Sequence, residues 1–188
     1  MKKLAVGVWM LGSITKGFGT DIENYQAPGN LISENDLECV GSEKLSNKYT
    51  PADLYKASAK CIDQNDYEKA AFLFALAGVY GRFDTYRVAD QTAHQAVTVL
   101  RMETFGSLDE DKSVAFKKAL LNSFHNPKKQ TMLCKQIVLI GSPNYYPTYM
   151  IQHGMGAFEQ KTNSDIVANF DAQAAWKKSL DTYLHCPK

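Results

Sequence analysis

The sequence predicts an all-α fold with six or seven helices in antiparallel helical hairpins, preceded by an irregular N-terminal lead-in. Apolar residues recur at helical spacing over most of the chain, and alternating runs typical of strands never exceed four or five residues. Thr50-Pro51 and Asn126-Pro127 each place a capping side chain before a proline that fits the first helical turn. With 188 residues, 45% of them hydrophobic, the chain can form one domain with its own core.

Residues 1–19 have the pattern of a secretory signal peptide. Met1, Lys2 and Lys3 form a basic start, residues 4–14 form an apolar run too short to span a bilayer, and residues 17–19 offer small side chains for cleavage. An ordinary N-terminal strand or helix is the alternative. Residues 20–49 show no sustained period, and we expect them to form an extended lead-in to a single helical domain at residues 50–188.

The helical domain opens with a predicted hairpin over residues 50–80. Thr50 and Asp53 are spaced as a capping box, and the polar residues 63–66 form the turn between two helices. One face of the first helix carries small and apolar residues, namely Leu54, Ala57, Ser58 and Cys61. The second helix carries small residues around large rings, namely Tyr67, Ala70, Ala71, Phe74 and Ala77. These faces predict close antiparallel packing.

This hairpin resembles one repeat of the tetratricopeptide and Sel1-like superfamily, in which helix pairs recur with a period in the thirties. The family's small, small, aromatic and small positions match Ser58, Ala70, Phe74 and Ala77. The family's tryptophan, tyrosine and nearby proline are replaced at or near Leu54, Cys61 and Arg82. The resemblance covers about one sixth of the chain, and it implies a stack of hairpins with a concave face for another protein.

Three further helices are predicted from capping signals. Residues 80–84 read as a turn, with Asp84 capping a long helix that ends near Thr104. Ser107 and Glu110 are spaced as a second capping box. The helix after it is expected to point inward at Val114, Ala115, Ala119, Leu120 and Phe124. After Asn126-Pro127, the next helix has the apolar face Met132, Ile137, Val138 and Ile140.

Glycines and prolines divide the C-terminal part. Gly141 is expected as a left-handed C-cap, and a short helix is expected from Pro147 to about His153, ended by Gly154. The last predicted helix has one apolar side, formed by Ala172, Ala175, Trp176, Leu180 and Leu184.

The chain has four cysteines, and an even number in an exported protein predicts two disulfides. Their wide spacing excludes a C-x-x-C redox motif and a zinc knuckle. Four cysteines allow three pairings. We expect Cys39–Cys61, which would tie the lead-in to the first helix, and Cys134–Cys186, which would tie the last helix to the core. Buried free thiols are the alternative.

No sequence motif indicates catalysis. The histidines stand singly, outside any metal-binding motif, and there is neither a G-x-S-x-G elbow nor a Gly-rich phosphate loop. We therefore expect no enzymatic activity, no metal and no cofactor. The net charge of +1 comes without a basic stripe, so nucleic acid is not an expected partner, and no segment of the mature chain favours membrane insertion.

Two candidate protein-binding surfaces emerge from the aromatic and basic residues. The first is a segment bounded by prolines and glycines, with Tyr145, Tyr146, Tyr149, Gln152 and His153. Tyrosine suits interfaces because an apolar ring carries a polar tip, although these rings are equally suited to cover the edge of the helical stack. The second candidate is the concave side of the hairpins, with Tyr80, Arg82, Tyr86, Arg87 and Gln91.

An exported, disulfide-bonded helical domain without catalytic motifs is best interpreted as a non-catalytic periplasmic binding protein. By its overall character it resembles periplasmic immunity proteins that neutralise antibacterial effector toxins, such as those of type VI secretion. The expected partner is then a secreted effector toxin. The alternatives are a helical-repeat adaptor or scaffold of the bacterial envelope and, with less support, a cell-envelope hydrolase.

Overall fold

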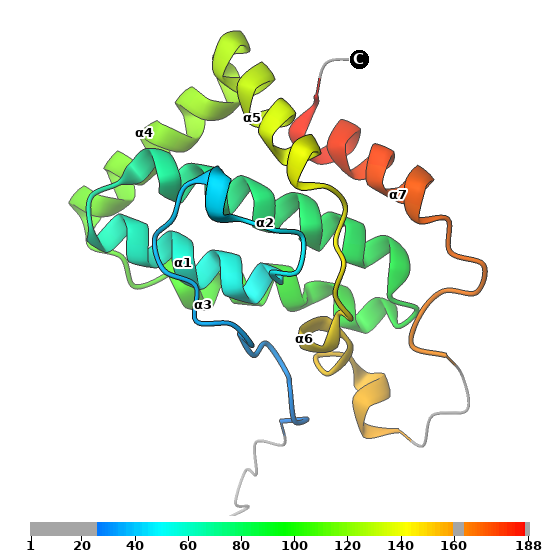
Figure 1. Ribbon diagram of the computed structural model, residues 1–188. Helices are drawn as coiled ribbons and strands as arrows, with labels where there is room; N and C mark the ends of the chain where they lie inside the picture. Colours follow the sequence, from blue (N-terminus) through cyan, green and yellow to red (C-terminus); the bar gives the residue numbers. More distant parts are fainter. Residues whose placement is uncertain (1–25, 160–163, 187–188) are drawn as a thin grey trace, which may run out of the picture.

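The structure, a computed structural model, describes residues 26–159 and 164–186 and confirms the predicted all-α fold (Figure 1). The predicted signal peptide and the first residues of the lead-in lie outside the described residues. Seven α-helices occur within these ranges: α1 (Pro51–Asp63), α2 (Tyr67–Arg87), α3 (Ala96–Phe105), α4 (Glu110–His125), α5 (Pro127–Ile140), α6 (Thr148–Ile151) and α7 (Ala172–Ser179). The described residues hold no strand, only an isolated antiparallel bridge between Val88 and Ile166.

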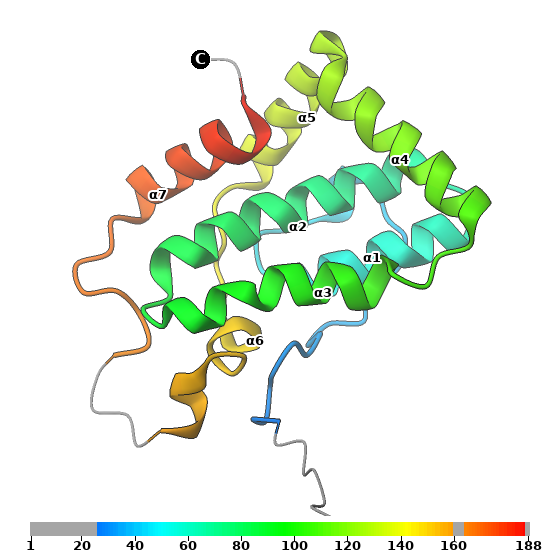
Figure 2. The same cartoon turned by 180° about the vertical axis from the view of Figure 1, so that it is seen from behind.

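Helix α2 is the centre of the fold. It packs against α1, α4 and α7, while α3 packs against α1 and α5 packs against α4. Figures 1 and 2 place α4, α5 and α7 on one side of α2 and α1 and α3 on the other. Helices therefore pack on both sides of α2, which is why this helix is apolar over most of its circumference.

The α1–α2 hairpin forms as predicted. The Thr50 side chain accepts from the Asp53 N–H, the Asp53 carboxylate accepts from the Thr50 N–H, and Pro51 takes the first turn. The two antiparallel helices lie close together, because small residues line their contact and the Ser58 hydroxyl donates to the Ala70 carbonyl at 2.9 Å.

The predicted turn at residues 80–84 is wrong, because α2 continues to Arg87. Asp84, expected as an exposed cap, is fully buried inside the helix and is paired with Arg87. The chain leaves the helix at Val88, and Asp90 caps the short 3-10 helix η2 (Gln91–Gln95) that leads into α3. The predicted long helix ending near Thr104 is accordingly divided: residues 85–87 belong to α2, and α-helix resumes only at α3.

The second capping box is also not formed. Helix α4 starts at Glu110 behind Asp109, whose side chain makes no capping hydrogen bond. Val114, expected inside, is exposed, and Phe116 is buried instead. Phe116 lies 5.6 Å from the Phe74 ring and 5.4 Å from the Phe105 ring, centroid to centroid. The helix is thus rotated so that it adds one ring to an aromatic cluster shared by four helices.

Helix α5 confirms the Asn126-Pro127 start, since the Asn126 side chain accepts from two backbone N–H groups of the first turn. Its inward residues are Leu133, Cys134 and Ile137, whereas Met132 and Val138, both expected inside, are exposed. Gly141 ends the helix with a positive φ of 93°, which favours glycine, but its ψ of 177° is not that of the left-handed C-cap predicted there. The last predicted helix ends at Ser179 and continues as the π-helical turn η4 (Leu180–Leu184).

The lead-in from residue 26 is irregular apart from the 3-10 turn η1 (Ser42–Lys44), and it is fastened to α1. The Asp53 carboxylate accepts from Ser33 Oγ at 2.9 Å and from Asn35 N and Nδ2 at 2.9 and 3.0 Å. Both predicted disulfides are present, Cys39–Cys61 to α1 and Cys134–Cys186 between α5 and the C-terminal segment. Such bonds persist in an oxidising, extracytoplasmic compartment.

None of the helices in the part of the chain that the structure describes combines the length and the apolar character that crossing a bilayer demands.

Candidate functional site

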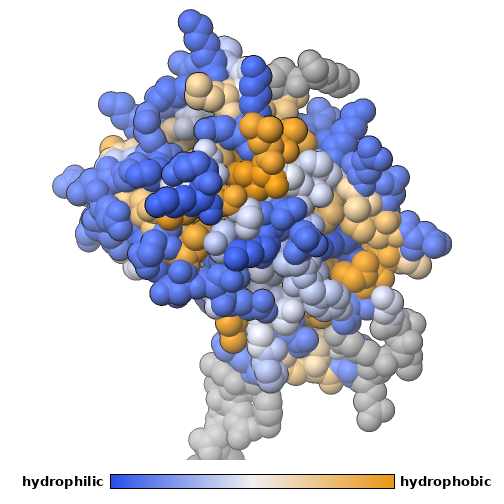
Figure 3. Space-filling model, viewed as in Figure 1, coloured by the Kyte–Doolittle hydropathy of each residue, from blue (hydrophilic) through white to orange (hydrophobic). Residues whose placement is uncertain are grey.

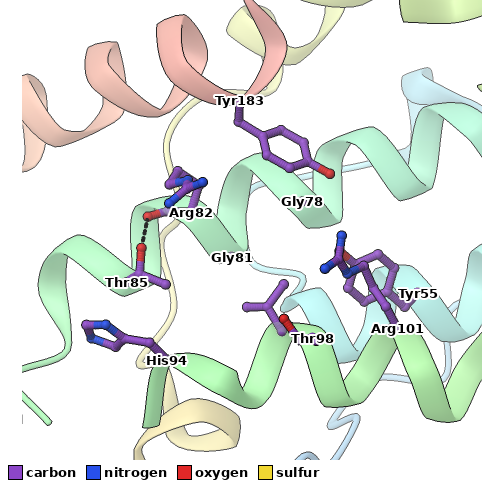
Figure 4. Close-up of a pocket in the computed structure, with 10 residues that line it drawn as sticks. Tyr55, Gly78, Gly81, Arg82, Thr85, His94, Thr98, Arg101 and Tyr183 are labelled. Carbon is purple, nitrogen blue, oxygen red and sulfur yellow. Dashed lines mark hydrogen bonds between the residues drawn. The ribbon is translucent and has the colours of Figure 1, made fainter. Parts of the chain in front are cut away.

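A pocket of about 180 Å³ lies where α2, α3 and the C-terminal turn η4 meet (Figure 4). In Figure 4, Thr98 and Arg101 rise from α3 toward α2, and Tyr183 descends toward α2 from the opposite side. The residues that line the pocket are Tyr55, Gly78, Gly81, Arg82, Thr85, His94, Val97, Thr98, Arg101 and Tyr183.

Two buried polar atoms in this pocket have no hydrogen-bonding partner among the described residues: the hydroxyl of Tyr55 and Nε of Arg101. Tyr55 is fully buried, and its ring packs against Phe74 and Phe105 at centroid distances of 5.4 and 5.7 Å. The ring is thus held in the aromatic cluster, and Tyr55 is also one of the residues that line the pocket. Buried polar atoms normally find partners, so two unpaired ones among the residues of one pocket mark it as a candidate binding site.

The pocket is electropositive. Arg82 and Arg101 both line it, and no aspartate or glutamate does. Neither arginine makes an ion pair within the described part of the chain. Burial raises the pKa of Tyr55 well above its ordinary value, and burial also raises the pKa of Tyr183, while the nearby arginines oppose both shifts. Both hydroxyls therefore stay protonated at neutral pH and can donate.

Gly78 gives the pocket its shape. A Cβ at this position would overlap the phenol of Tyr183, so only glycine lets that ring lie against α2. A Cβ at Gly81 would come within 2.7 Å of the Val97 side chain on α3. The two glycines, one helical turn apart, let both α3 and η4 approach α2 closely.

The chemistry available in the pocket is donation of hydrogen bonds and positive charge. Its single histidine, His94, has Nε2 at 2.9 Å from the Val88 carbonyl, and because a carbonyl only accepts, Nε2 carries the hydrogen. No carboxylate lines the site to orient this imidazole, and no cysteine lines it to act as a nucleophile. The arrangement suits binding of an anion better than a bond-breaking reaction.

The structure gathers three of the predicted binding residues into a buried network around Asp84. Tyr145 and Tyr149 donate to Asp84 Oδ2 at 2.9 and 2.7 Å, and Arg87 pairs with Oδ1 at 2.7 Å. Arg87 also donates to the Tyr145 carbonyl at 2.8 Å, and its guanidinium lies 4.9 Å from the Tyr145 ring centroid. Burial raises the pKa of Asp84, against the opposing effect of Arg87 and the two phenols.

The network joins α2 to α6 through Tyr149 and to the segment before α6 through Tyr145, so it fixes how the proline-bounded segment lies on the core. Tyr149 is 2% exposed and Arg87 is 9% exposed. Tyr149 and Arg87 therefore hold the proline-bounded segment in place from inside the molecule. A partner that bound to this segment would contact its backbone and the neighbouring side chains instead.

The other predicted binding residues are distributed over the surface. Tyr146 is 55% exposed and donates to Asp165 at 2.8 Å. His153 and Gln152 are half-buried near the lead-in, with His153 Nδ1 at 2.9 Å from Asn30 Oδ1. Tyr86 is half-buried beside α7, where the Lys178 ammonium lies 4.5 Å from its ring centroid. On the predicted concave side, Arg82 and Gln91 are exposed, whereas Tyr80 is buried and donates to the Gly141 carbonyl.

A second concavity, a groove of about 710 Å³, separates α5 from α7 and η4. Val138 on α5 and Leu180 on η4 line it, and Lys177 and Lys178 stand at its edge. Figure 3 shows apolar side chains gathered over α5 on this face of the molecule. The exposed apolar residues of α4 and α5 are Val114, Leu121, Met132, Val138 and Leu139.

Of the residues that line the pocket, only Arg82 was among the predicted binding residues. The available signals for the others were the Gly78/Gly81 spacing in the middle of an apolar helix and Arg101 in the run from Val97 to Met102, which is otherwise apolar except for Thr98. Tyr55 gave no signal beyond core periodicity. No group of three or more His, Cys, Asp or Glu side chains that could hold a metal occurs among residues 26–159 and 164–186.

Comparison with known proteins gives no relative, since no protein-family model, no curated protein and no solved structure matches this chain.

Proposed function

We propose that this protein is a non-catalytic periplasmic binding protein, and that it serves as an immunity protein which neutralises an antibacterial effector toxin. The observation that carries the proposal is the unpaired apolar surface of the α4–α5 hairpin beside the α5–α7 groove. The pairing of all four cysteines supports export to an oxidising compartment, and the pattern of residues 1–19 favours the periplasm.

The apolar surface has the spacing of a docking face. Met132 and Leu139 are two helical turns apart on α5, and they are 64% and 85% exposed. Val114 and Leu121 repeat the same spacing on α4, at 63% and 49% exposure. Single exposed apolar residues are ordinary, but two of them two turns apart on each of two packed helices favour contact with another protein.

Charge indicates the chemistry of the partner. Lys177 and Lys178 stand at the edge of the groove, against a single acidic residue, Asp181. An apolar centre with a basic rim fits a partner segment that presents an apolar anchor flanked by acidic residues. A toxin blocked in this way would lose access to its substrate without any reaction catalysed by its inhibitor.

The experiment that tests this role is site-specific photo-cross-linking of the full chain, exported in the bacterium that produces it. A photoreactive residue replaces Leu139 in one strain and Glu103 in the other. Glu103 is an exposed position on α3, on the other side of α2. We expect one cross-linked protein from position 139 and none of it from position 103.

The identified partner then decides between the functions. It should inhibit growth when exported alone to the periplasm of a laboratory bacterium. Co-export of this chain should restore growth, whereas the Leu139→Asp variant should fail to do so. A partner that is harmless and belongs to an envelope assembly would instead identify a scaffold. Equal cross-linking from both positions would refute the proposed docking face.

A further inference from the structure

We infer that the pocket between α2, α3 and η4 is a binding site for a small anionic molecule, held through a carboxylate or phosphate group by Arg101, Tyr55 and Tyr183. This site is separate from the α5–α7 groove, and the inference does not depend on the proposed function.

The first support is the set of unused donors. Arg101 Nε and the Tyr55 hydroxyl are both buried, and neither has a hydrogen-bonding partner within the described residues. Tyr55 is 0% exposed, so its hydroxyl is screened from bulk solvent by the protein. Leaving such donors unpaired costs stability, and an oxyanion that accepts from both removes that cost.

The second support is that the donors converge. The ionisation of Tyr55 is influenced by both Arg101 and Tyr183, and that of Tyr183 by both Arg101 and Arg82. Tyr55 on α1, Arg101 on α3 and Tyr183 on η4 therefore lie within electrostatic range of one another, and Arg82 on α2 lies within range of Tyr183. Figure 4 shows the Arg101 guanidinium and the Tyr183 phenol directed toward the same space beside Gly78.

The third support is the sign of the charge. Two guanidinium groups without an acidic partner face a site that contains only neutral hydroxyls, an imidazole and apolar walls. An anion is attracted to positive charge that has no acidic partner, and the attraction is stronger where water is largely excluded. Arg101 is half-buried and Arg82 is exposed, so Arg101 forms the interior of the site and Arg82 its mouth.

Size limits the ligand. The volume of about 180 Å³ is close to that of a cavity of ~150 Å³, which admits a benzene-sized molecule. The ligand therefore consists of one anionic group on a compact body of about the size of a six-membered ring, and Val97 and the two glycines provide the apolar contact. Nucleotides and peptides are too large to enter.

The test uses the intact, oxidised protein and three probes of equal shape: benzoate, phenylphosphate and the neutral benzamide. Binding is measured by isothermal titration calorimetry at low salt and by the NMR shift of the Arg101 Nε–H signal. We expect at least one of the two anions to bind with a Kd on the order of 0.1–1 mM and to move that signal. We also expect weaker binding as salt rises, and no binding of benzamide.

Variants identify the donors. Arg101→Gln is expected to lower the affinity about tenfold or more, and Tyr55→Phe several-fold, because each removes a hydrogen bond to a charged group. Lys117→Gln, an exposed cation on α4 far from the pocket, is the matched control and should bind normally. Arg82→Gln, at the mouth, provides a second charge variant if Arg101→Gln fails to fold.

Each outcome has a fixed meaning. Binding of benzoate alone or of phenylphosphate alone supports the site and names the source of the anion. Benzamide binding as tightly as the anions, an Arg101 signal that no probe moves, or anion binding that survives Arg101→Gln (or Tyr55→Phe, where Arg101→Gln does not fold) would each overturn the inference.

Discussion

Two buried tyrosines with opposite hydrogen bonding provide a sharp test of the structure. Tyr149 and Tyr55 are 2% and 0% exposed, and each ring is packed in the core. The Tyr149 hydroxyl donates to the Asp84 carboxylate at 2.7 Å, whereas the Tyr55 hydroxyl has no partner among the described residues. Replacement by phenylalanine removes one oxygen from each site and keeps the ring. Tyr149→Phe should therefore lower the free energy of unfolding, whereas Tyr55→Phe should not.

The magnitudes follow from the hydrogen bonds. Tyr149→Phe removes a bond to a buried charge, so we expect a loss of about 2 kcal/mol, which lowers Tm by about 4–8 °C in a domain of this size. Tyr55→Phe removes an unpaired donor, so stability should stay unchanged or rise by about 1 kcal/mol. Tyr146→Phe serves as an exposed control, with an expected change below about 0.5 kcal/mol.

The assay is urea unfolding of the oxidised protein, followed by far-UV circular dichroism, with thermal melts as a second measurement. A loss of similar size in Tyr55→Phe and Tyr149→Phe would refute the reasoning, because it would mean that the Tyr55 hydroxyl also has a partner. A loss below about 0.5 kcal/mol in Tyr149→Phe would show that the Asp84 network adds little to stability.

Three further results are expected. Replacing both Cys134 and Cys186 by alanine should lower the free energy of unfolding by about 4 kcal/mol, because this disulfide closes a separation of 52 residues. The urea midpoint in non-reducing buffer measures the loss, and an unchanged midpoint would contradict a stabilising role of the bond. Gly78→Ala should destabilise by about 1–3 kcal/mol in thermal melts despite the better helix propensity of alanine, because the new Cβ would overlap Tyr183; a stabilised variant would mean that this ring does not lie against α2. Burial lowers the pKa of His153 below 6.5, so protonation favours the unfolded chain. The contribution of His153 to stability should be constant above about pH 7.5 and fall as the pH drops through 6.5. Urea unfolding of His153→Gln at several pH values should lack this decrease.

Local signals predicted the parts of the fold that depend on local chemistry. The capping box of Thr50 and Asp53 and the Asn126-Pro127 start are formed by residues at most three positions apart, so they are legible in the sequence. The same holds for Gly141, whose positive φ is a property of one residue in its turn. The cysteine pairing was predicted on the expectation that one bond ties the lead-in to the first helix and the other ties the last helix to the core.

The same kind of signal failed where a distant contact overrode it. Asp84 reads as a cap because an aspartate usually costs too much to bury. In the fold, Arg87 and the phenols of Tyr145 and Tyr149 compensate its charge, so α2 continues through it. The signal for a turn at residues 80–84 was a local preference, and the two phenols that help to outweigh it lie about sixty positions away.

The sequence by itself determined the helical class, the first hairpin, the two disulfides and the absence of a recognised catalytic motif. Only the tertiary structure decided which faces are covered and which residues meet. Periodicity marks an apolar stripe on a helix, but the rotation of α4 toward Phe116 and the exposure of Leu139 depend on what packs beside each helix. The pocket of Tyr55, Arg101 and Tyr183 draws on three elements whose donors become neighbours only when α3 and η4 close on the glycines of α2. Sequence periodicity records the environment of a residue within its own helix, whereas a site depends on distances between helices.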